Sequence, residues 1–224
     1  AGLSGNISID AGTVTLSSGG FLDTDTANGQ GGSVTVKAAQ SLALSGRAFI
    51  SAGTNGAGDA GSLSIETPRL SLDNARIEAE SRGSGAAGSI DVATAELLLG
   101  NGSLITATTF ADGTGGQLLI NADTITIGRA SGLVTETAGS GAAGAIFIEA
   151  DSLAIERGFI RSSSFIAPEA DPSQLPQGAA GSILIETGTL SVRQGAISSS
   201  TVGGGLAGLI GISAETIALF ESSL

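Results

Sequence analysis

The sequence predicts an all-β fold, a right-handed parallel β-solenoid that forms a single domain over residues 1–224. Three observations support this prediction: a Gly-rich marker that recurs along the chain, pairs of aliphatic residues at strand spacing after each marker, and a hydrophobic content with only 3% aromatic residues. One unit of about 28 residues then forms one coil. We expect about eight coils, with three short strands in each.

The marker is the four-residue pattern Gly-x-(Ala/Gly/Ser)-Gly, which occurs eight times. Its copies begin at Gly2, Gly29, Gly58, Gly85, Gly113, Gly141, Gly178 and Gly205. The intervals are 27, 29, 27, 28, 28, 37 and 27 residues, a single period that is interrupted once. Because glycine adopts positive φ at little cost and lets backbones approach closely, we expect each marker to close a turn of the coil.

Two pairs of aliphatic residues follow each marker, and the members of a pair are two residues apart. The first pairs are Ile7/Ile9, Val34/Val36, Leu63/Ile65, Ile90/Val92, Leu118/Ile120, Ile146/Ile148, Ile183/Ile185 and Ile210/Ile212. The second pairs are Val14/Leu16, Leu42/Leu44, Leu70/Leu72, Leu97/Leu99, Ile125/Ile127, Leu153/Ile155, Leu190/Val192 and Ile217/Leu219. Since side chains two apart on a strand share a face, we predict that all these residues line the core. Phe147, between the members of one pair, should face outward.

A small residue, always Ala or Thr, stands between the two pairs and is expected to turn a corner. These residues are Ala11, Ala38, Thr67, Thr94, Ala122, Ala150, Thr187 and Ala214. A third strand is expected at one aliphatic position per unit: Leu22, Ile50, Ile77, Ile105, Val134, Ile160 and Ile197. The absence of a 3.6-residue period argues against helical repeats, and a propeller blade needs about 40 residues and four strands.

Composition and charge argue against several functions. Nine basic residues against 21 acidic ones give a formal charge of −12, which repels nucleic acid, so no nucleic-acid partner is expected. No apolar stretch approaches the ~20 residues that a membrane span requires, so we expect no membrane span. The chain contains no Cys, so neither disulfides nor thiolate metal sites are expected.

The acidic residues offer little support for an enzyme. Glu66, Glu149 and Glu186 fall at one repeat position, and Asp91 is expected one residue away from this series. Glycoside hydrolysis needs two carboxylates in one cleft, and the chain has no His, Tyr or Trp to supply the usual bases and sugar-stacking rings. We therefore favour a solvated acidic row and predict no enzyme activity, with a polysaccharide-active β-helix enzyme as the least favoured alternative.

No cofactor is predicted. Asp23 and Asp25 alternate on one segment, and Asp59 and Asp112 lie in expected loops, where their oxygens suit a hard cation such as Ca²⁺. The Gly-Gly-x-Gly-x-Asp motif of calcium-binding β-rolls is absent from the sequence. We expect weak, incidental calcium binding at most and no dedicated metal site.

The longest unit carries an insertion at residues 165–177 that holds three of the four prolines. Proline cannot donate to a β-ladder, so this segment is expected to leave the coil as a loop. Insertions in solenoids are often binding sites, although lengthening a loop costs little and a tolerated surface excursion is the simpler alternative. The candidate partner-contact residues are Phe165, Pro168, Glu169, Asp171, Pro172, Leu175 and Pro176.

Residues 181–201 run Gly-Ser-Ile-Leu-Ile-Glu-Thr-Gly-Thr-Leu-Ser-Val-Arg-Gln-Gly-Ala-Ile-Ser-Ser-Ser-Thr. This unit resembles the repeats of filamentous-haemagglutinin-like exoproteins, especially the cyanobacterial pattern Gly-x-Ile-x-Ile-x-Thr followed by Leu-x-Leu-x-x-Gly-Ala-x-Ile-Ser-Ala-Ser-Thr. The resemblance covers the whole chain. It implies export by two-partner secretion through an outer-membrane transporter, and a location that is extracellular or on the outer cell surface.

The resemblance implies a structural rod segment of a fibrous adhesin, with a host or neighbouring cell surface or the extracellular matrix as partner. The family's secretion domain, with its Asn-Pro-Asn-type motifs, is not in this sequence, so we expect the chain to be a stretch of the distal rod. No functional residue carries over, because the repeats are architectural. The alternative is an extracellular filament subunit that binds copies of itself end to end, since open solenoid ends expose strand edges.

Overall fold

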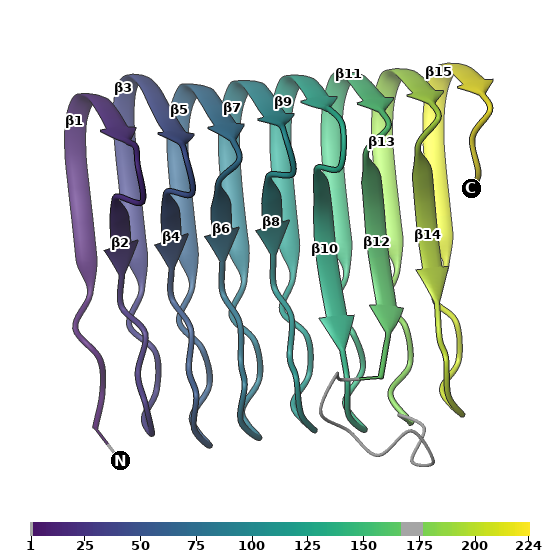
Figure 1. The fold of residues 1–224 in the computed structure, drawn as a ribbon. Coiled ribbons are helices and arrows are strands. Elements are labelled where there is room, and N and C mark those ends of the chain that lie inside the picture. Colours follow the sequence, from purple (N-terminus) through teal and green to yellow (C-terminus); the bar gives the residue numbers. More distant parts are fainter. Residues whose placement is uncertain (1, 167–176) are drawn as a thin grey trace.

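The computed structural model describes residues 2–166 and 177–224, and it shows an all-β parallel β-solenoid, as predicted. About seven turns stack along one axis, with β1 at one end of the stack and β15 at the other (Figure 1). The eighth unit contributes a long strand without a second strand after it, which is why the stack is shorter than the expected eight coils. None of the described residues forms a helix, and so none forms a helix that could cross a membrane.

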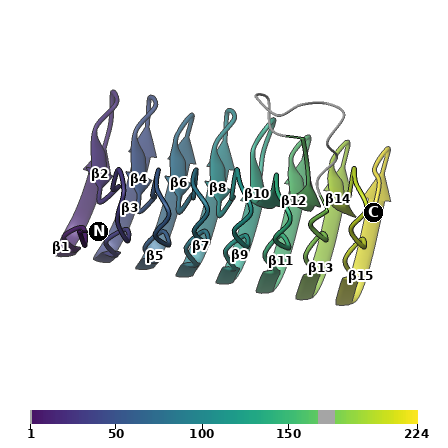
Figure 2. The same cartoon turned by 90° about the horizontal axis from the view of Figure 1, so that it is seen from below.

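Each complete coil contributes one long and one short strand. The long strands are β1 (Ile7–Leu16), β3 (Val34–Ser45), β5 (Leu63–Asp73), β7 (Ile90–Gly100), β9 (Leu118–Ile127), β11 (Ile146–Glu156), β13 (Ile183–Arg193) and β15 (Ile210–Phe220). The short strands are β2 (Phe21–Asp23), β4 (Phe49–Ser51), β6 (Arg76–Glu78), β8 (Leu104–Thr106), β10 (Gly132–Thr137), β12 (Phe159–Ser164) and β14 (Ala196–Ser200). They form an eight-stranded and a seven-stranded sheet, which run side by side along the stack (Figure 2).

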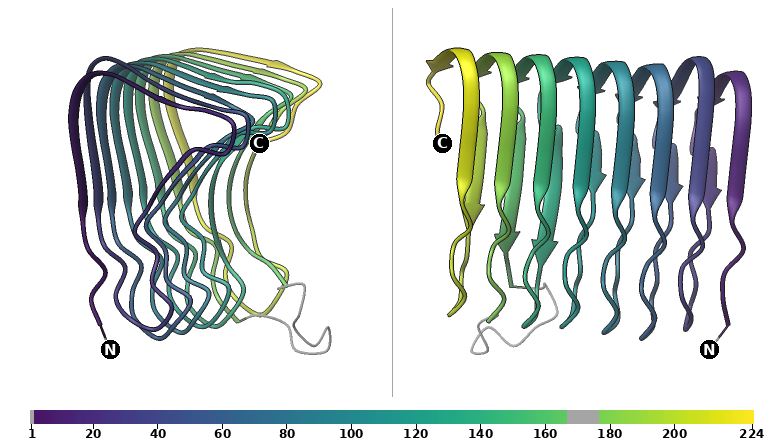
Figure 3. Two further views of the ribbon diagram at one scale, coloured as in Figure 1. Left: turned by 60° about the vertical axis from the view of Figure 1, so that its left-hand side comes forward. Right: turned by 180° about the vertical axis from the view of Figure 1, so that it is seen from behind.

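The expected three strands per coil are observed as two, because both aliphatic pairs of a unit lie on one long strand that bends at the corner residue (Figure 3). The corner side chain points inward, and where it is Thr its hydroxyl needs a buried partner. Thr94 Oγ1 donates to the Glu96 carbonyl at 3.0 Å, and Thr187 Oγ1 donates to the Thr189 carbonyl at 3.2 Å. Strand pairing continues through the corner, with a register shift there only where β3 pairs with β1 and β5, so the corner is a bend in one strand.

The aliphatic pairs form the core, as predicted. From Val34 to Val192 every member of a pair is at most 3% exposed. The pairs stack in register, so that Ile146 lies between Leu118 and Ile183. Each coil between the two ends thus buries its inner face against its two neighbours.

The third ladder is confirmed in every coil except one. Leu133, not Val134, pairs with Ile105 and Ile160 and lies in the core, while Val134 belongs to the outward row beside Arg161. The inward residue follows the preceding pair by five or six residues in the other coils, and Leu133 keeps that spacing after Ile127. The prediction of Val134 was wrong because it ignored this spacing.

The marker glycines are needed for close backbone approach, and positive φ is not their role. A Cβ on Gly116 would lie 1.9 Å from the Gly88 carbonyl oxygen, and one on Gly144 would lie 1.8 Å from that of Gly116. Neither glycine has a positive φ. The coils therefore approach each other most closely at the markers, where no side chain fits between them.

Positive φ occurs instead in the tight turn after each long strand, mostly at residues other than glycine. The non-glycine residues with φ between 49° and 68° are Ser18, Arg47, Asn74, Asn101, Ala130, Arg157, Gln194 and Glu221. This conformation is unfavourable for residues with a Cβ. Stacking of the turns, for example through Ala130 N–H to the Arg157 carbonyl at 2.9 Å, holds it in place.

Replacing Gly116 by Ala should destabilise the protein by about 1–3 kcal/mol or more, because the new Cβ forces two coil backbones apart. The matched control is Gly100→Ala, since a Cβ there meets only the Leu72 carbonyl oxygen at 3.8 Å, an ordinary contact. Urea unfolding of both variants measures the difference. Equal midpoints for the two variants would contradict this account of the markers.

Candidate functional site

Of the predicted contact loop at residues 165–177, the structure describes only residues 165, 166 and 177, and Phe165 is the one candidate contact residue among them. The Phe165 ring meets the Phe110 ring edge-on, with 5.8 Å between centroids, and Phe165 N–H donates to the Thr137 carbonyl at 2.9 Å. This residue is therefore anchored on the coil below it. The remaining candidates lie outside the described residues: Pro168, Glu169, Asp171, Pro172, Leu175 and Pro176. The loop's role as a contact site stays a prediction.

Three of the loop aspartates considered for calcium hold neighbouring coils together. Asp25 Oδ1 accepts hydrogen bonds from Gly53 N–H and, at 2.5 Å, from Ser51 Oγ. Asp59 Oδ1 accepts from a backbone N–H of the next coil at 2.8 Å. Asp112 Oδ1 accepts from Ser140 N–H and Oγ at 3.0 Å each, and these bonds lower the pKa of Asp112. Within residues 2–166 and 177–224 no group of three or more acidic residues is arranged to hold a metal ion.

The predicted acidic row exists on the outer face of the long strands. Glu149 on β11 pairs directly with Glu186 on β13, as expected for one repeat position on adjacent coils. Glu66 occupies the same position on β5, where Lys37 Nζ contacts its carboxylate at 2.8 Å. Asp91 was expected one residue from this series but lies two residues from it, in register with Ser64. The alternation of the strand therefore keeps Asp91 on the outer face.

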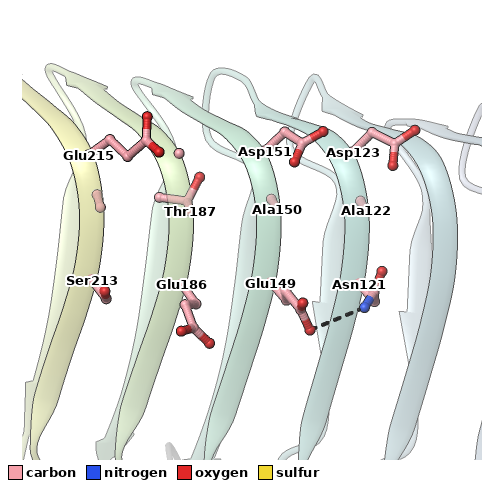
Figure 4. A pocket seen from close by; sticks show the side chains of 12 residues that line it. Asn121, Ala122, Asp123, Glu149, Ala150, Asp151, Glu186, Thr187, Ser213 and Glu215 are labelled. Carbon is pink, nitrogen blue, oxygen red and sulfur yellow. Dashed lines mark hydrogen bonds between the residues drawn. The ribbon is translucent and has the colours of Figure 1, made fainter.

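The acidic row borders an open trough of about 540 Å³ on four successive long strands (Figure 4). One wall carries Asn121, Glu149, Glu186 and Ser213, and the other carries Asp123, Asp151 and Glu215. The corner residues form the floor between them. Glu149 accepts a hydrogen bond from its neighbour along the row, Asn121 Nδ2, at 3.3 Å, and this is the one hydrogen bond drawn in Figure 4.

A second hollow, also about 540 Å³, adjoins the acidic wall and is mainly apolar. It is formed by the outward residues two positions earlier on the same strands, Leu119, Phe147 and Leu184, and it ends at Gly211. The outward position of Phe147 is confirmed. The sequence pattern predicted the outward position of Phe147 but not its apolar neighbours on the adjacent coils. The repeat alignment could have found this apolar row, because Leu119 and Leu184 occupy the same repeat position.

On the short strand β6 and just after it, the carboxylates of Glu78 and Glu80 are largely buried, which the sequence did not reveal. Burial, and to a lesser extent the neighbouring charge of Glu78, raise the pKa of Glu80 to about 7. The pKa of Glu78 is raised by burial as well. Arg82 Nη2 lies 3.6 Å from the Glu80 carboxylate and opposes the shift without cancelling it. This pair carries an energetic penalty when it is ionised.

No family model, curated protein or solved structure matches the chain. The architecture and the outer surfaces of the solenoid are therefore the basis for a function. Of these surfaces, the trough and the adjoining apolar row form the most distinct candidate site on the described residues, and the Pro-rich loop remains the candidate from the sequence.

Replacing Glu80 by Gln should stabilise the protein more at pH 8 than at pH 5. Because the folded pKa of Glu80 lies above its unfolded value, its favourable contribution is present at low pH and is lost as the pH rises from about 4.5 to about 7. Removing the charge should raise the free energy of unfolding by up to about 3 kcal/mol at pH 8. Urea unfolding at both pH values measures the difference.

Thr108→Val is the matched control, since Thr108 is buried at the equivalent position of the next coil and does not ionise. Its effect should be equal at the two pH values. An effect of Glu80→Gln that does not change with pH would show that Glu80 is ionised without penalty.

Proposed function

We propose that the chain is a structural rod segment of a secreted or surface-exposed fibrous adhesin, of the filamentous-haemagglutinin-like kind exported by two-partner secretion. The observation that carries the proposal is the continuous parallel pairing of the long strands from β1 to β15, whose register shifts only at the bends of β1–β3 and β3–β5. The register continues across the insertion, where Glu149 pairs with Glu186 although 37 residues separate them. The insertion is thus accommodated without a break in the rod.

The physical argument is that each coil contacts only its neighbours. In such a stack, adding coils extends the rod without a new core, and the outer face of each coil is free to vary. This suits a stalk that projects contact surfaces toward a host or neighbouring cell or toward the extracellular matrix. The acidic charge of −12 suits a rod that has to stay soluble outside the cell. An outer-membrane transporter is the expected partner during export.

Antibodies raised against this chain should label intact cells of the source organism or detect the protein in the culture medium. The measurement is immunogold electron microscopy of intact and permeabilised cells, together with blotting of the medium. Cells that lack the partner transporter should lose the surface label. Labelling that requires permeabilisation in the normal strain would overturn the proposal.

A self-assembling filament is the second candidate, and the exposed inner positions of β15 favour it. Ile217 is 48% and Leu219 is 45% exposed, whereas the equivalent Leu190 and Val192 are fully buried at 0%. A coil from a second copy could cover them, because β1 carries aliphatic residues at the same positions. These are Ile7, Ile9, Val14 and Leu16.

Electron microscopy of the purified chain across a concentration series tests this second candidate. End-to-end stacking predicts long filaments with a repeat of about 4.8 Å along the axis, and Leu219→Lys should block their growth by placing a charge in the contact. Short, dispersed rods at every concentration would reject the filament and leave the stalk proposal unaffected.

A further inference from the structure

The outer face of β9, β11, β13 and β15 differs from the rest of the long-strand sheet. We call it the apolar–acidic surface. It consists of an apolar row, an acidic row beside it, and a second acidic row beyond the bend: Leu119, Phe147 and Leu184; Glu149 and Glu186; Asp123, Asp151 and Glu215. The apolar hollow and the acidic trough share Glu149, Glu186 and Ser213, so they form one continuous surface.

The apolar row is restricted to three successive coils. Leu119 is 47% and Leu184 is 38% exposed, and Phe147 lies between them in register. At the equivalent position the earlier long strands carry only polar residues. These are Ser8, Thr35, Ser64 and Asp91. The core does not require an apolar residue here, because the position faces away from it. An exposed apolar row of this kind is typical of a surface that binds another molecule.

The acidic rows have no internal compensation. No ion pair among the described residues involves any carboxylate of this surface; the four that form are Lys37–Glu66, Arg69–Glu96, Arg82–Glu80 and Arg161–Glu136. Glu149 and Glu186 stand directly opposite each other on adjacent strands, and like charges so placed are destabilising. The equivalent row on the earlier coils is paired, through Lys37 and Glu66. Basic groups from a partner would relieve the repulsion.

The spacing of the rows selects the shape of that partner. Equivalent residues repeat every ~4.8 Å along the axis, and the apolar and acidic rows lie about 7 Å apart, two residues along the strand. One turn of an α-helix advances 5.4 Å, and a helix is about 10 Å wide with its side chains, so a helix along the axis can meet both rows. An extended peptide repeats its side chains every ~6.8 Å and loses register with the coils sooner.

A second copy of this chain does not fit the surface. The chain has nine basic residues against 21 acidic ones, and it contains no helix among its described residues. Two copies would approach with like charge. The complement of the surface is therefore another molecule.

We propose that the apolar–acidic surface of β9–β15 binds an amphipathic α-helix of another protein, with the helix axis along the solenoid axis. Apolar residues of the helix cover Leu119, Phe147 and Leu184, and a stripe of Lys or Arg along one flank pairs with Glu149 and Glu186. The proposal is independent of the adhesin proposal, because it concerns only this surface.

The probe is a fluorescently labelled synthetic peptide of about 18 residues, long enough to cross four coils, with a Leu stripe and Lys along one flank. Fluorescence anisotropy with the full 224-residue chain at physiological salt should show saturable binding at one site. Two double variants should each weaken binding about tenfold or more. One combines Phe147→Ser with Leu184→Ser, and the other combines Glu149→Gln with Glu186→Gln. Thermal melts verify that both variants are folded.

Glu66→Gln is the control variant, because it removes a carboxylate at the same coil position outside the surface, and binding should stay unchanged. Two further peptides of the same composition test the shape, one with its order shuffled to destroy the stripes and one with alternating Leu and Lys for an extended chain. If either peptide binds as tightly as the amphipathic probe, the proposal is overturned, and the binding reflects a general attraction of cations to an acidic rod. Absence of saturable binding, or variants that bind as tightly as the original chain, would overturn it as well.

Discussion

A single coil of this protein cannot bury its own inner face, and the rest of the structure follows from that constraint. Between the two end coils, every inward side chain is covered by the equivalent side chains of the coils on either side, as Ile146 is by Leu118 and Ile183. Such cover requires strict register and close approach. Register places each aliphatic side chain against aliphatic side chains of the next coil. The marker glycines allow two backbones to approach closely, since a Cβ on Gly116 would lie 1.9 Å from a carbonyl oxygen. The repeated sequence is the consequence, because every coil has to satisfy the same two neighbours.

The outer face is released from this constraint, and there the coils differ. The same outward row carries a Lys37–Glu66 pair on early coils and the adjacent carboxylates of Glu149 and Glu186 on later ones. Uncompensated charge and exposed apolar area therefore accumulate on the outside without disturbing the stack. Recognition is expected on these variable surfaces, and the inner ladders maintain the rod.

The sequence was sufficient for the fold because the aliphatic spacing and the Gly period encode the inner face directly. It was less informative where several side chains satisfy the same pattern. Val134 was taken for Leu133 because both are aliphatic, and the corner was expected to separate two strands although the ladder continues through it. The left-handed turn residues could not be foreseen, since they share no residue type and only the stacked turns hold them in place. The burial of Glu80 depends on neighbouring coils, which no single unit reveals.

Disulfide trapping across the insertion tests the in-register stack most directly. The chain has no cysteine, and Ser152 pairs with Thr189 although the two are 37 residues apart, well beyond the usual period. Register partners on adjacent parallel strands lie about 4.8 Å apart, within the range of Cα distances that a disulfide spans. The chain carrying Ser152→Cys and Thr189→Cys should cross-link fully under mild oxidation, and the pair Ser152→Cys and Ser191→Cys should not. Equal cross-linking of both pairs, or of neither, would contradict the stack described here.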